Sequence, residues 1–351
     1  MVSVNKKVYI MDFGNHYKQI MHSARLYNFD GEVRVVCTKN QKAKYCSFLS
    51  SDRIDVVDSI PSVFSLFFKF FFASKFVLLT GPFYGSKLKN TFSSIFLFLV
   101  FLGRHVLNKY SVIYVKDIRC YTKGGGVNKA SLHLVDNVFF ESESLTNLAL
   151  TIGVGSESKN RTSYVYFSDT LSEQARCSNV DISLIRAAKQ KGYSVVGVIG
   201  QFDSVKRDYS WLKKSELKKV FFVQVGRFVD STDNQVCAKQ LQGVLHFLQA
   251  DFSNDDLDCV LLQCDVLLSL NTSDLGYDKY KGTAAFGEAI SVSKPLVIPS
   301  FCDLNLEFEE FSFYYDSEQS FDSSLAAAID FGSSTAFDYF TVEEVRKRLF
   351  E

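Results

Sequence analysis

The sequence predicts an α/β protein with two Rossmann-like, doubly wound parallel-sheet domains. Short apolar runs typical of buried strands alternate with helical stretches along the chain, and this alternation favours parallel sheets with right-handed crossovers. The 351 residues are enough for two domains of ordinary size, and 47% of them are hydrophobic, so the chain can bury a large core. The polar stretch 151–162 is the predicted linker, which gives domains of residues 1–155 and 156–351.

The first domain is predicted to contain a series of short apolar strands joined by helices. Its first strand ends at Asp12, and the turn 13–16 leads into a helix that holds Ile20. Residues 124–126 are three glycines and indicate a flexible loop. The strands are expected at 8–12, 32–37, 54–58, 76–80 and 111–116, and the later helices at 62–73, 87–103 and 130–135.

The second domain is predicted to repeat this alternation. Its first strand is expected at 163–167, directly after the linker. Further strands are expected at 194–199, 219–225, 264–270 and 295–299, and helices at 181–190, 236–249 and 342–350. Another helix carries Glu288 and is expected to end at Lys294-Pro295.

The stretch 281–300 is the most informative part of the chain. A buried strand at 264–270 precedes a polar loop, and Gly282 and Thr283 then lead into a helix that ends before Pro295. This order places free backbone amides and the positive end of a helix dipole at the carboxyl edge of a parallel sheet. Phosphates and sugar hydroxyls bind well there.

Residues 264–299, CDVLLSL…KGTAAFGEAISVSKPLVIP, resemble the donor-site segment of GT-B glycosyltransferases, in particular the family 4 type of bacterial surface-polysaccharide assembly. The resemblance implies two domains that face a cleft, with a nucleotide-sugar donor on the second and an acceptor on the first. It also implies that Glu288 contacts the nucleotide ribose and that Gly282 and Thr283 meet the diphosphate. Many retaining members carry a second glutamate eight positions earlier, where this sequence has Tyr280.

Three other residues of the second domain are candidate phosphate contacts. Arg227 follows Gly226 at the end of a predicted strand, although an arginine there could equally be solvated. The family element "G-r-x-x-x-K-G" is not found near the expected start of the domain. Residues 166–170 stand in its place, and Ser168 and Thr170 are the hydroxyl groups there that could contact phosphate.

The candidate catalytic residues lie after first-domain strands, where cleft residues gather in doubly wound sheets. Asp12, His16 and Asp117 could each deprotonate an acceptor hydroxyl, and each could equally cap a helix. The acceptor contacts expected in the same region are Asn15, Arg119 and Lys123.

The charge of the chain is unevenly distributed although the net charge is zero. Residues 1–150 hold 19 Lys and Arg against 10 Asp and Glu, and the remainder holds 20 against 29. This division argues against a nucleic-acid binder with a uniform basic face and suits a first domain that meets something anionic.

Two phenylalanine-rich stretches, 62–81 and 92–103, are too interrupted or too short to span a bilayer. Two readings stay open. Their helices could pack on both sides of the sheet, or part of this surface could enter a bilayer with cations beside anionic headgroups. The cations in the second reading are Lys69, Lys75, Lys87, Lys89 and Arg104.

The eight cysteines contain no Cys-x-x-Cys pair, so no zinc site is expected, and without a recognisable secretory signal they read as reduced thiols. The histidines and acidic residues show no spacing for a divalent metal. We therefore expect a metal-independent enzyme without a cofactor, in which the nucleotide sugar is a substrate. The expected localisation is cytoplasmic, with peripheral contact to the inner face of the inner membrane under the second reading.

The function expected from these features is sugar transfer from a nucleotide-sugar donor to a saccharide or polyprenyl-linked acceptor, in O-antigen or capsule biosynthesis. One alternative is a sugar-nucleotide 2-epimerase of the same architecture, which needs no acceptor. Another is a non-catalytic GT-B-like subunit that partners an active enzyme, which Tyr280 in place of the family glutamate would favour.

Overall fold

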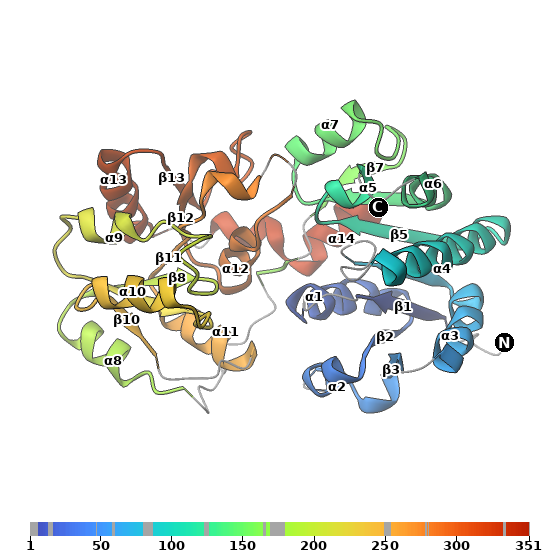
Figure 1. The fold of residues 1–351 in the computed structure, drawn as a ribbon, viewed down its shortest axis with the longest axis horizontal. Helices are drawn as coiled ribbons and strands as arrows, with labels where there is room; N and C mark the ends of the chain where they lie inside the picture. The colour runs from blue at the N-terminus through green and yellow to red at the C-terminus, as the bar shows by residue number, and fades with distance from the viewer. Residues whose placement is uncertain are drawn as a thin grey trace. The chain divides into compact units, whose positions relative to one another are not determined.

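The chain forms two compact units in the computed structural model (Figure 1). The first comprises Met1–Val165, Lys279–Gly282 and Arg346–Glu351, and the second comprises Tyr166–Asp278 and Thr283–Val345. The structure describes residues 6–12, 17–46, 48–57, 60–79, 87–122, 126–163, 166–168, 180–248, 254–277, 279, 281–332 and 335–350.

The first unit contains a parallel sheet of seven strands within the described residues, in the order β3-β2-β1-β4-β5-β6-β7. The order reverses between β1 and β4, as in a doubly wound fold. The strands are β1 (Lys7–Met11), β2 (Glu32–Thr38), β3 (Ile54–Val57), β4 (Lys75–Leu78), β5 (Tyr110–Val115), β6 (Asn137–Phe140) and β7 (Asn160–Thr162).

Helices cover both faces of this sheet, because successive residues of each strand point to opposite faces. On one face Tyr9, Phe76 and Ile113 share a buried cluster with residues of α3, α4, α6 and α7. The helices are α1 (Tyr17–Tyr27), α2 (Lys39–Tyr45), α3 (Ile60–Phe72), α4 (Lys87–Val106), α5 (Arg119–Thr122), α6 (Gly126–Leu134) and α7 (Glu143–Thr151).

The second unit contains a parallel sheet of six strands within the described residues, in the order β10-β9-β8-β11-β12-β13. Its order reverses between β8 and β11. The strands are β8 (Ser194–Ile199), β9 (Val220–Val225), β10 (Leu245–Phe247), β11 (Val266–Leu268), β12 (Leu296–Pro299) and β13 (Ser312–Tyr315). The helices are α8 (Ser183–Gln190), α9 (Ser210–Lys214), α10 (Thr232–Gln240), α11 (Asn254–Gln263), α12 (Ala284–Val292) and α13 (Glu318–Ile329). The last helix, α14 (Val342–Phe350), begins in the second unit, and its residues from Arg346 onward belong to the first.

The predicted fold class of two Rossmann-like, doubly wound parallel sheets is confirmed, and several element predictions are corrected. The expected linker 151–162 contains β7, which pairs with β6 at the edge of the first sheet. The first strand of the second sheet among the described residues is β8, not a strand at 163–167. The expected helix 236–249 divides into α10 and β10, because Gly243, at φ +82°, stands in the turn between them.

The phenylalanine-rich helices α3 and α4 lie side by side on one face of the first sheet, not on both faces as the core-packing reading assumed. Gly103 of α4 permits this close packing. A Cβ atom there would lie 1.7 Å from the Phe71 ring of α3. Among the described residues, no helix combines the length and the apolar character needed to cross a bilayer.

The expectation of reduced thiols holds at six cysteines and fails at Cys259. Cys259 is disulfide-bonded, and its partner lies outside the described residues. Spacing along the chain does not reveal which cysteines the fold brings together, so this bond could not be predicted from the sequence. The free cysteines are Cys37, Cys46, Cys120, Cys237, Cys264 and Cys302.

Candidate functional site

Two glycines shape the carboxyl edge of the second sheet, where β8 and β9 end. Gly200 has φ +95° and Gly226 has φ +145°, a region that side chains rarely adopt. A Cβ atom on Gly226 would lie 2.2 Å from the Gly200 carbonyl oxygen. The Gln224 side-chain amide donates to the same oxygen at 2.6 Å. A Cβ atom on Gly200 would lie 1.9 Å from the Arg207 guanidinium. The two glycines therefore let the ends of β8 and β9 pack closely on each other and on Arg207.

Arg207 lies at the point where the strand order reverses. Its Nε donates to the carbonyl oxygen of Ile199, the last residue of β8, at 3.3 Å. Its backbone pairs with Asn271, three residues after β11, in an antiparallel bridge. Its side chain is half-buried. Arg207 thus joins the ends of β8 and β11 and brings a positive charge to the crevice position of a doubly wound sheet.

The N-terminus of α12 adjoins the same edge through Asn271 and Thr283. The Asn271 side-chain amide donates to the Thr283 hydroxyl at 3.3 Å, and that hydroxyl accepts from the Ala285 amide at 3.3 Å. Thr283 is therefore the N-cap of α12. A helix of this length presents a positive dipole end at its first turn, which favours anions.

Glu288 is the half-buried position of an otherwise deeply packed α12. Its neighbours Gly287 and Ala289 are buried, and a Cβ on Gly287 would lie 2.3 Å from the Tyr166 ring. Glu288 follows the exposed Ala284 by four residues, so both lie on the helix face that the core leaves uncovered. The position agrees with a role outside the core.

The other predicted contacts of the second unit lie in different surroundings. Arg227 is exposed at the end of β9, one strand away from the reversal of strand order. Ser168 lies against the 3₁₀-helix Thr335–Phe340, where its hydroxyl donates to the Phe337 carbonyl at 2.9 Å. Their phosphate contacts stay predictions, and Thr170 lies outside the described residues.

Sequence reasoning missed Arg207 and Asn271. It searched for a glycine-and-cation element after an expected strand at 163–167, whereas the sheet begins with β8. The signal that could have found the element is Gly200 followed by the basic pair Lys206-Arg207 in the loop after β8. Lys206 is itself occupied by an ion pair with Asp203 at 2.9 Å.

Asp12 ends β1 at the reversal point of the first sheet and is fully buried. The pKa of the Tyr45 phenol on α2 is raised mainly by burial and next by the nearby charge of Asp12. Tyr45 stacks on Tyr17 at the start of α1, with ring centroids 6.1 Å apart. Asp12 is thus a buried carboxylate close to the Tyr45 phenol, which stays protonated.

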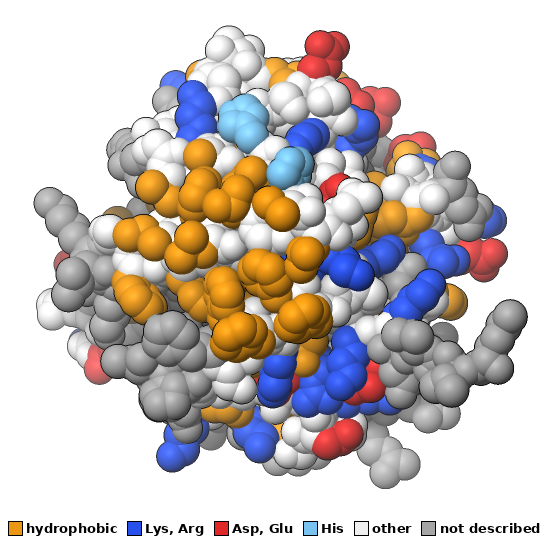
Figure 2. Space-filling model, turned by 90° about the vertical axis from the view of Figure 1, so that its right-hand side faces the viewer, with side chains coloured by type: hydrophobic (Ala, Val, Ile, Leu, Met, Phe, Trp, Pro, Cys, Tyr) orange, Lys and Arg blue, Asp and Glu red, His pale blue; other side chains and the backbone are white. Residues whose placement is uncertain are grey.

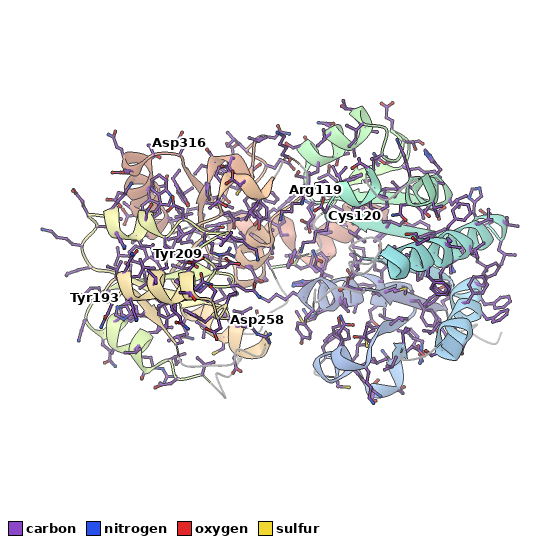
Figure 3. The ribbon with its side chains drawn as sticks, viewed as in Figure 1. Arg119, Cys120, Tyr193, Tyr209, Asp258 and Asp316 are labelled. Carbon is purple, nitrogen blue, oxygen red and sulfur yellow. The ribbon has the colours of Figure 1, made fainter. Side chains whose placement is uncertain are left out.

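Asp117 follows β5 and is held by Arg119, the first residue of α5, which is labelled in Figure 3. Arg119 Nη2 and Nε lie 2.6 Å and 2.9 Å from the two carboxylate oxygens, and the Arg119 backbone amide donates to Oδ1 at 2.9 Å. The two predicted site residues are therefore brought together, and the carboxylate orients the start of α5. These bonds occupy both oxygens of the proposed base.

Glu141 is a third carboxylate at this edge, and sequence reasoning did not select it. It follows β6, as Asp12 follows β1 and Asp117 follows β5, and this shared position was the available signal. Gln19 of α1 donates to Glu141 Oε1 at 2.9 Å. A Cβ on Gly282 would lie 2.0 Å from Glu141 Oε2, so the absence of a side chain lets the loop pack on this carboxylate.

The loop Lys279–Gly282 therefore belongs to the first unit, although the sequence grouped Gly282 with Thr283 as a diphosphate contact. Lys281 pairs with Asp117 in an antiparallel bridge. The residues Asn15, His16, Lys123 and Tyr280 lie outside the described residues. Within the part of the chain that the structure describes, no three histidine, cysteine or acidic side chains cluster to hold a metal ion.

Comparison with known proteins supports the fold. The sequence matches no family profile and no curated protein. Solved structures similar to this chain include Anabaena HepE in complex with UDP, with 14% identity, 98% of both chains covered and a TM-score of 0.65. An α,α-trehalose-phosphate synthase (UDP-forming) from Burkholderia vietnamiensis has 10% identity, 98% of both chains covered and a TM-score of 0.56.

A putative UDP-N-acetylglucosamine 2-epimerase from Listeria monocytogenes is also similar, with 10% identity over 99% of this chain and 95% of that chain and a TM-score of 0.59. The similarity runs the full length of the chain and includes both parallel-sheet units. The fold of the chain is therefore GT-B.

Proposed function

We propose that this protein is a glycosyltransferase that moves a sugar from a uridine-diphosphate sugar to a saccharide or polyprenyl-linked acceptor in bacterial polysaccharide biosynthesis. The observation that carries the proposal is the second-unit arrangement of Gly200, Gly226, Arg207 and the N-terminus of α12 around one reversal point. Uridine diphosphate is the favoured nucleotide because similar structures hold UDP or UDP-glucose.

In this proposal the second unit binds the donor and stabilises its leaving group. The Arg207 guanidinium and the free amides of α12 would neutralise the diphosphate as the bond to the anomeric carbon breaks. Glu288 would accept hydrogen bonds from the ribose hydroxyls, and Arg227 would add a solvent-exposed cation. The chemistry is proposed to need neither metal nor cofactor.

The first unit would bind the acceptor and supply the base. Asp12, Asp117 and Glu141 all lie at the carboxyl edge of its sheet, and one of them would take the proton from the attacking hydroxyl. Asp117 is tied to Arg119, so a second role for it is to hold that guanidinium near an anionic or sugar acceptor. His16, Asn15 and Lys123 stay candidates for the same task.

The test is nucleotide binding by thermal shift and titration calorimetry with UDP, GDP and ADP. UDP at a hundred times its Kd should stabilise the protein by about 2.7 kcal/mol. Arg207→Ala should weaken UDP binding roughly tenfold to a hundredfold, because a hydrogen-bonded charge pair contributes about 1.5–3 kcal/mol. The matched control is Arg186→Ala on α8, an exposed arginine away from the edge. Equal UDP affinity in all three proteins would contradict the assignment.

A sugar-nucleotide 2-epimerase is the second candidate, favoured by the similarity to the Listeria protein. An epimerase would convert a UDP-N-acetylhexosamine to its epimer without any acceptor. A transferase would release stoichiometric UDP only when an acceptor is added. Chromatography of UDP-sugars after incubation with and without an acceptor mixture separates the two.

We extend the proposal to peripheral contact between the first unit and an anionic membrane at the inner face of the inner membrane. The support is the excess of basic residues in 1–150 together with exposed aromatic side chains on α3 and α4. Membrane contact would place the enzyme near a polyprenyl-linked acceptor. The residues that make this contact are argued next.

A further inference from the structure

An apolar stripe runs along the outward face of α4. Phe92, Ile95, Leu99, Leu102 and Val106 recur at intervals of three and four residues, and all are exposed. Over 14 residues an α-helix rises about 21 Å, so the stripe is long and straight. On α3, Phe68 and Phe72 are exposed at a spacing of four residues, Phe72 by 74%.

This stripe is distinct from the core. The inward face of α4 buries Leu97, Val100 and Phe101, and α3 buries Leu66 and Phe70 in the same cluster. Each of the two helices therefore has two apolar faces. One face packs on the sheet and the other is exposed. Figure 2 shows the outward faces as a continuous hydrophobic area bordered below by Lys and Arg side chains. Contiguous exposed apolar surface of this kind marks an interaction site.

A groove of about 550 Å³ lies beside the exposed phenylalanines of α3. It runs along the amino ends of β1, β4 and β5, because Lys6, Lys7, Ser74 and Lys109 stand at those ends. This edge is opposite to the edge that holds Asp12, Asp117 and Glu141. The groove is lined by Lys6, Lys7, Tyr9, Phe68, Lys69, Phe72, Ala73, Ser74 and Lys109.

Three of the groove lysines carry uncompensated charge. Lys6, Lys7 and Lys109 are exposed, and none forms an ion pair with a residue that the structure describes. The Asp55 carboxylate forms ion pairs with Lys69 at 2.7 Å and with Arg34 at 2.9 Å, and not with these three lysines. The groove therefore combines aromatic walls with free ammonium groups.

The structure changes the set of cations that the sequence proposed for a membrane contact. Arg104 is fully buried, where it donates to the Phe70 carbonyl and, at 3.0 Å, to the Ala73 carbonyl at the end of α3. It thereby fixes the wall of the groove. Lys75 lies 4.9 Å from the centre of the Tyr110 ring, and Lys69 is paired. Nothing is described of the Lys87 and Lys89 side chains.

We propose that the groove and the outward faces of α3 and α4 form one docking surface for an anionic phospholipid bilayer. Lys6, Lys7 and Lys109 would bind phosphate headgroups, while Phe68, Phe72 and the α4 stripe enter the acyl boundary. The inference names the partner surface for the membrane contact in the proposed function, but it does not depend on the sugar chemistry.

Charge complementarity selects the bilayer over a second copy of the chain. A two-fold contact through this face would bring the same lysines toward each other, and like charges at an interface oppose association. A phosphate layer supplies the missing negative charge. Docking on the amino edge also leaves the carboxyl edge of the sheet, with its three carboxylates, uncovered for a substrate.

The test is co-sedimentation of the full chain with vesicles of phosphatidylcholine, with or without phosphatidylglycerol. The protein should bind the anionic vesicles at 50 mM salt and less at 1 M, where the Debye length falls to about 3 Å. The triple variant K6E/K7E/K109E should lower the partition coefficient by at least ~100-fold, from about a factor of five per removed basic group. F68S/F72S should remove most of the binding that persists at 1 M salt.

Matched controls carry the same changes on the second unit. K191E/K218E/K239E reverses three exposed lysines that form no ion pair with a described residue, and V205S/V236S removes two exposed apolar side chains. Both controls should bind vesicles like the wild type. Wild-type protein that stays in the supernatant with anionic vesicles at 50 mM salt would overturn the proposal, as would equal losses in the control and groove variants.

Two further measurements separate the alternatives. Sedimentation velocity that shows a dimer lost in F68S/F72S, without vesicle binding, would assign the surface to a second copy and overturn the bilayer assignment. UDP thermal shift on the same proteins keeps the two proposals apart. The groove variants should retain the wild-type UDP shift, and vesicle binding by a protein with no UDP shift would refute the proposed function while sustaining the docking surface.

Discussion

The two units share one strand order but differ in what lies at the edges of their sheets. In each sheet the strand order reverses between the first and fourth strands of the unit, β1 and β4 in the first and β8 and β11 in the second. At the reversal point the second unit places two glycines and Arg207, whereas the first places the buried carboxylate of Asp12. The same strand order thus carries a glycine-rich, cationic edge in one unit and an acidic edge in the other. Topology fixes where a site forms, and the side chains fix its chemistry.

The largest expected effect concerns the acidic edge of the first unit. Conservative replacement of the true base, by Glu141→Gln, Asp117→Asn or Asp12→Asn, should lower kcat by roughly 10²–10⁴ while UDP affinity stays unchanged. UDP release with an identified acceptor gives kcat, and calorimetry gives affinity. Glu141→Gln retains an oxygen for Gln19, so its packing is preserved. If all three variants turn over like the wild type, the base lies elsewhere.

The glycines of the second unit should be intolerant of any side chain. Gly226→Ala must place a Cβ against the Gly200 carbonyl at a backbone angle that alanine disfavours, and should cost about 3 kcal/mol of unfolding free energy. The matched control is Gly192→Ala, where φ is +76° and no atom lies within 4 Å. It should cost only about 1 kcal/mol. Urea denaturation measures the unfolding free energy of both variants. Equal losses would show that the contact between the Gly226 Cβ position and the Gly200 carbonyl does not limit substitution.

Glu288→Ala tests the proposed contact between the second unit and the nucleotide ribose. We expect roughly tenfold weaker UDP binding, about 1.4 kcal/mol, because one charge-assisted hydrogen bond to ribose is lost. Circular dichroism should show an unchanged fold, since Glu288 is half-buried. Unchanged affinity in a folded variant would exclude Glu288 from the site.

A pH experiment compares one histidine from each unit, the buried His22 and the half-exposed His246. Burial, with Lys18 and Arg25 nearby, lowers the pKa of His22 well below its ordinary value. Below about pH 6.5 the unfolded chain takes up a proton that folded His22 resists, so stability should fall as pH falls, by up to about 1.4 kcal/mol per pH unit. His22→Gln should flatten the fall between pH 7 and 5.

The second-unit histidine His246 should contribute less to this pH dependence. Burial also lowers the pKa of His246, but this ring is half-exposed on β10 and stacks on Phe221 at 4.2 Å between ring centroids. His246→Gln should therefore leave most of the acid sensitivity in place. Thermal unfolding at fixed ionic strength measures both variants, and a larger effect at His246 would reverse the ranking.

The smallest expected effect is that of metal removal. Excess EDTA should leave turnover within about twofold, since cations and amides are proposed to stabilise the leaving group. Loss of activity with recovery on adding manganese or magnesium would show that the second unit holds a metal with its donor.

The sequence by itself determined the helices and strands that are specified by short-range patterns. The helix α12 and the strand β12 follow from a helical apolar period and a proline stop within twenty residues. The alternation of such elements also determined the fold class. These features depend on interactions between near neighbours in the chain, which a sequence displays directly.

Only the tertiary structure decided which distant residues meet. The bridge of Arg207 to Asn271, the contact of Glu141 with Gln19 and Gly282, and the entry of Lys279–Gly282 into the first unit leave no local pattern. The helix α4 shows the same limit. Its apolar residues occupy two faces, and periodicity reports their spacing but not which face another element covers. Burial is a property of packing between elements, so the exposed stripe became visible only in the folded chain.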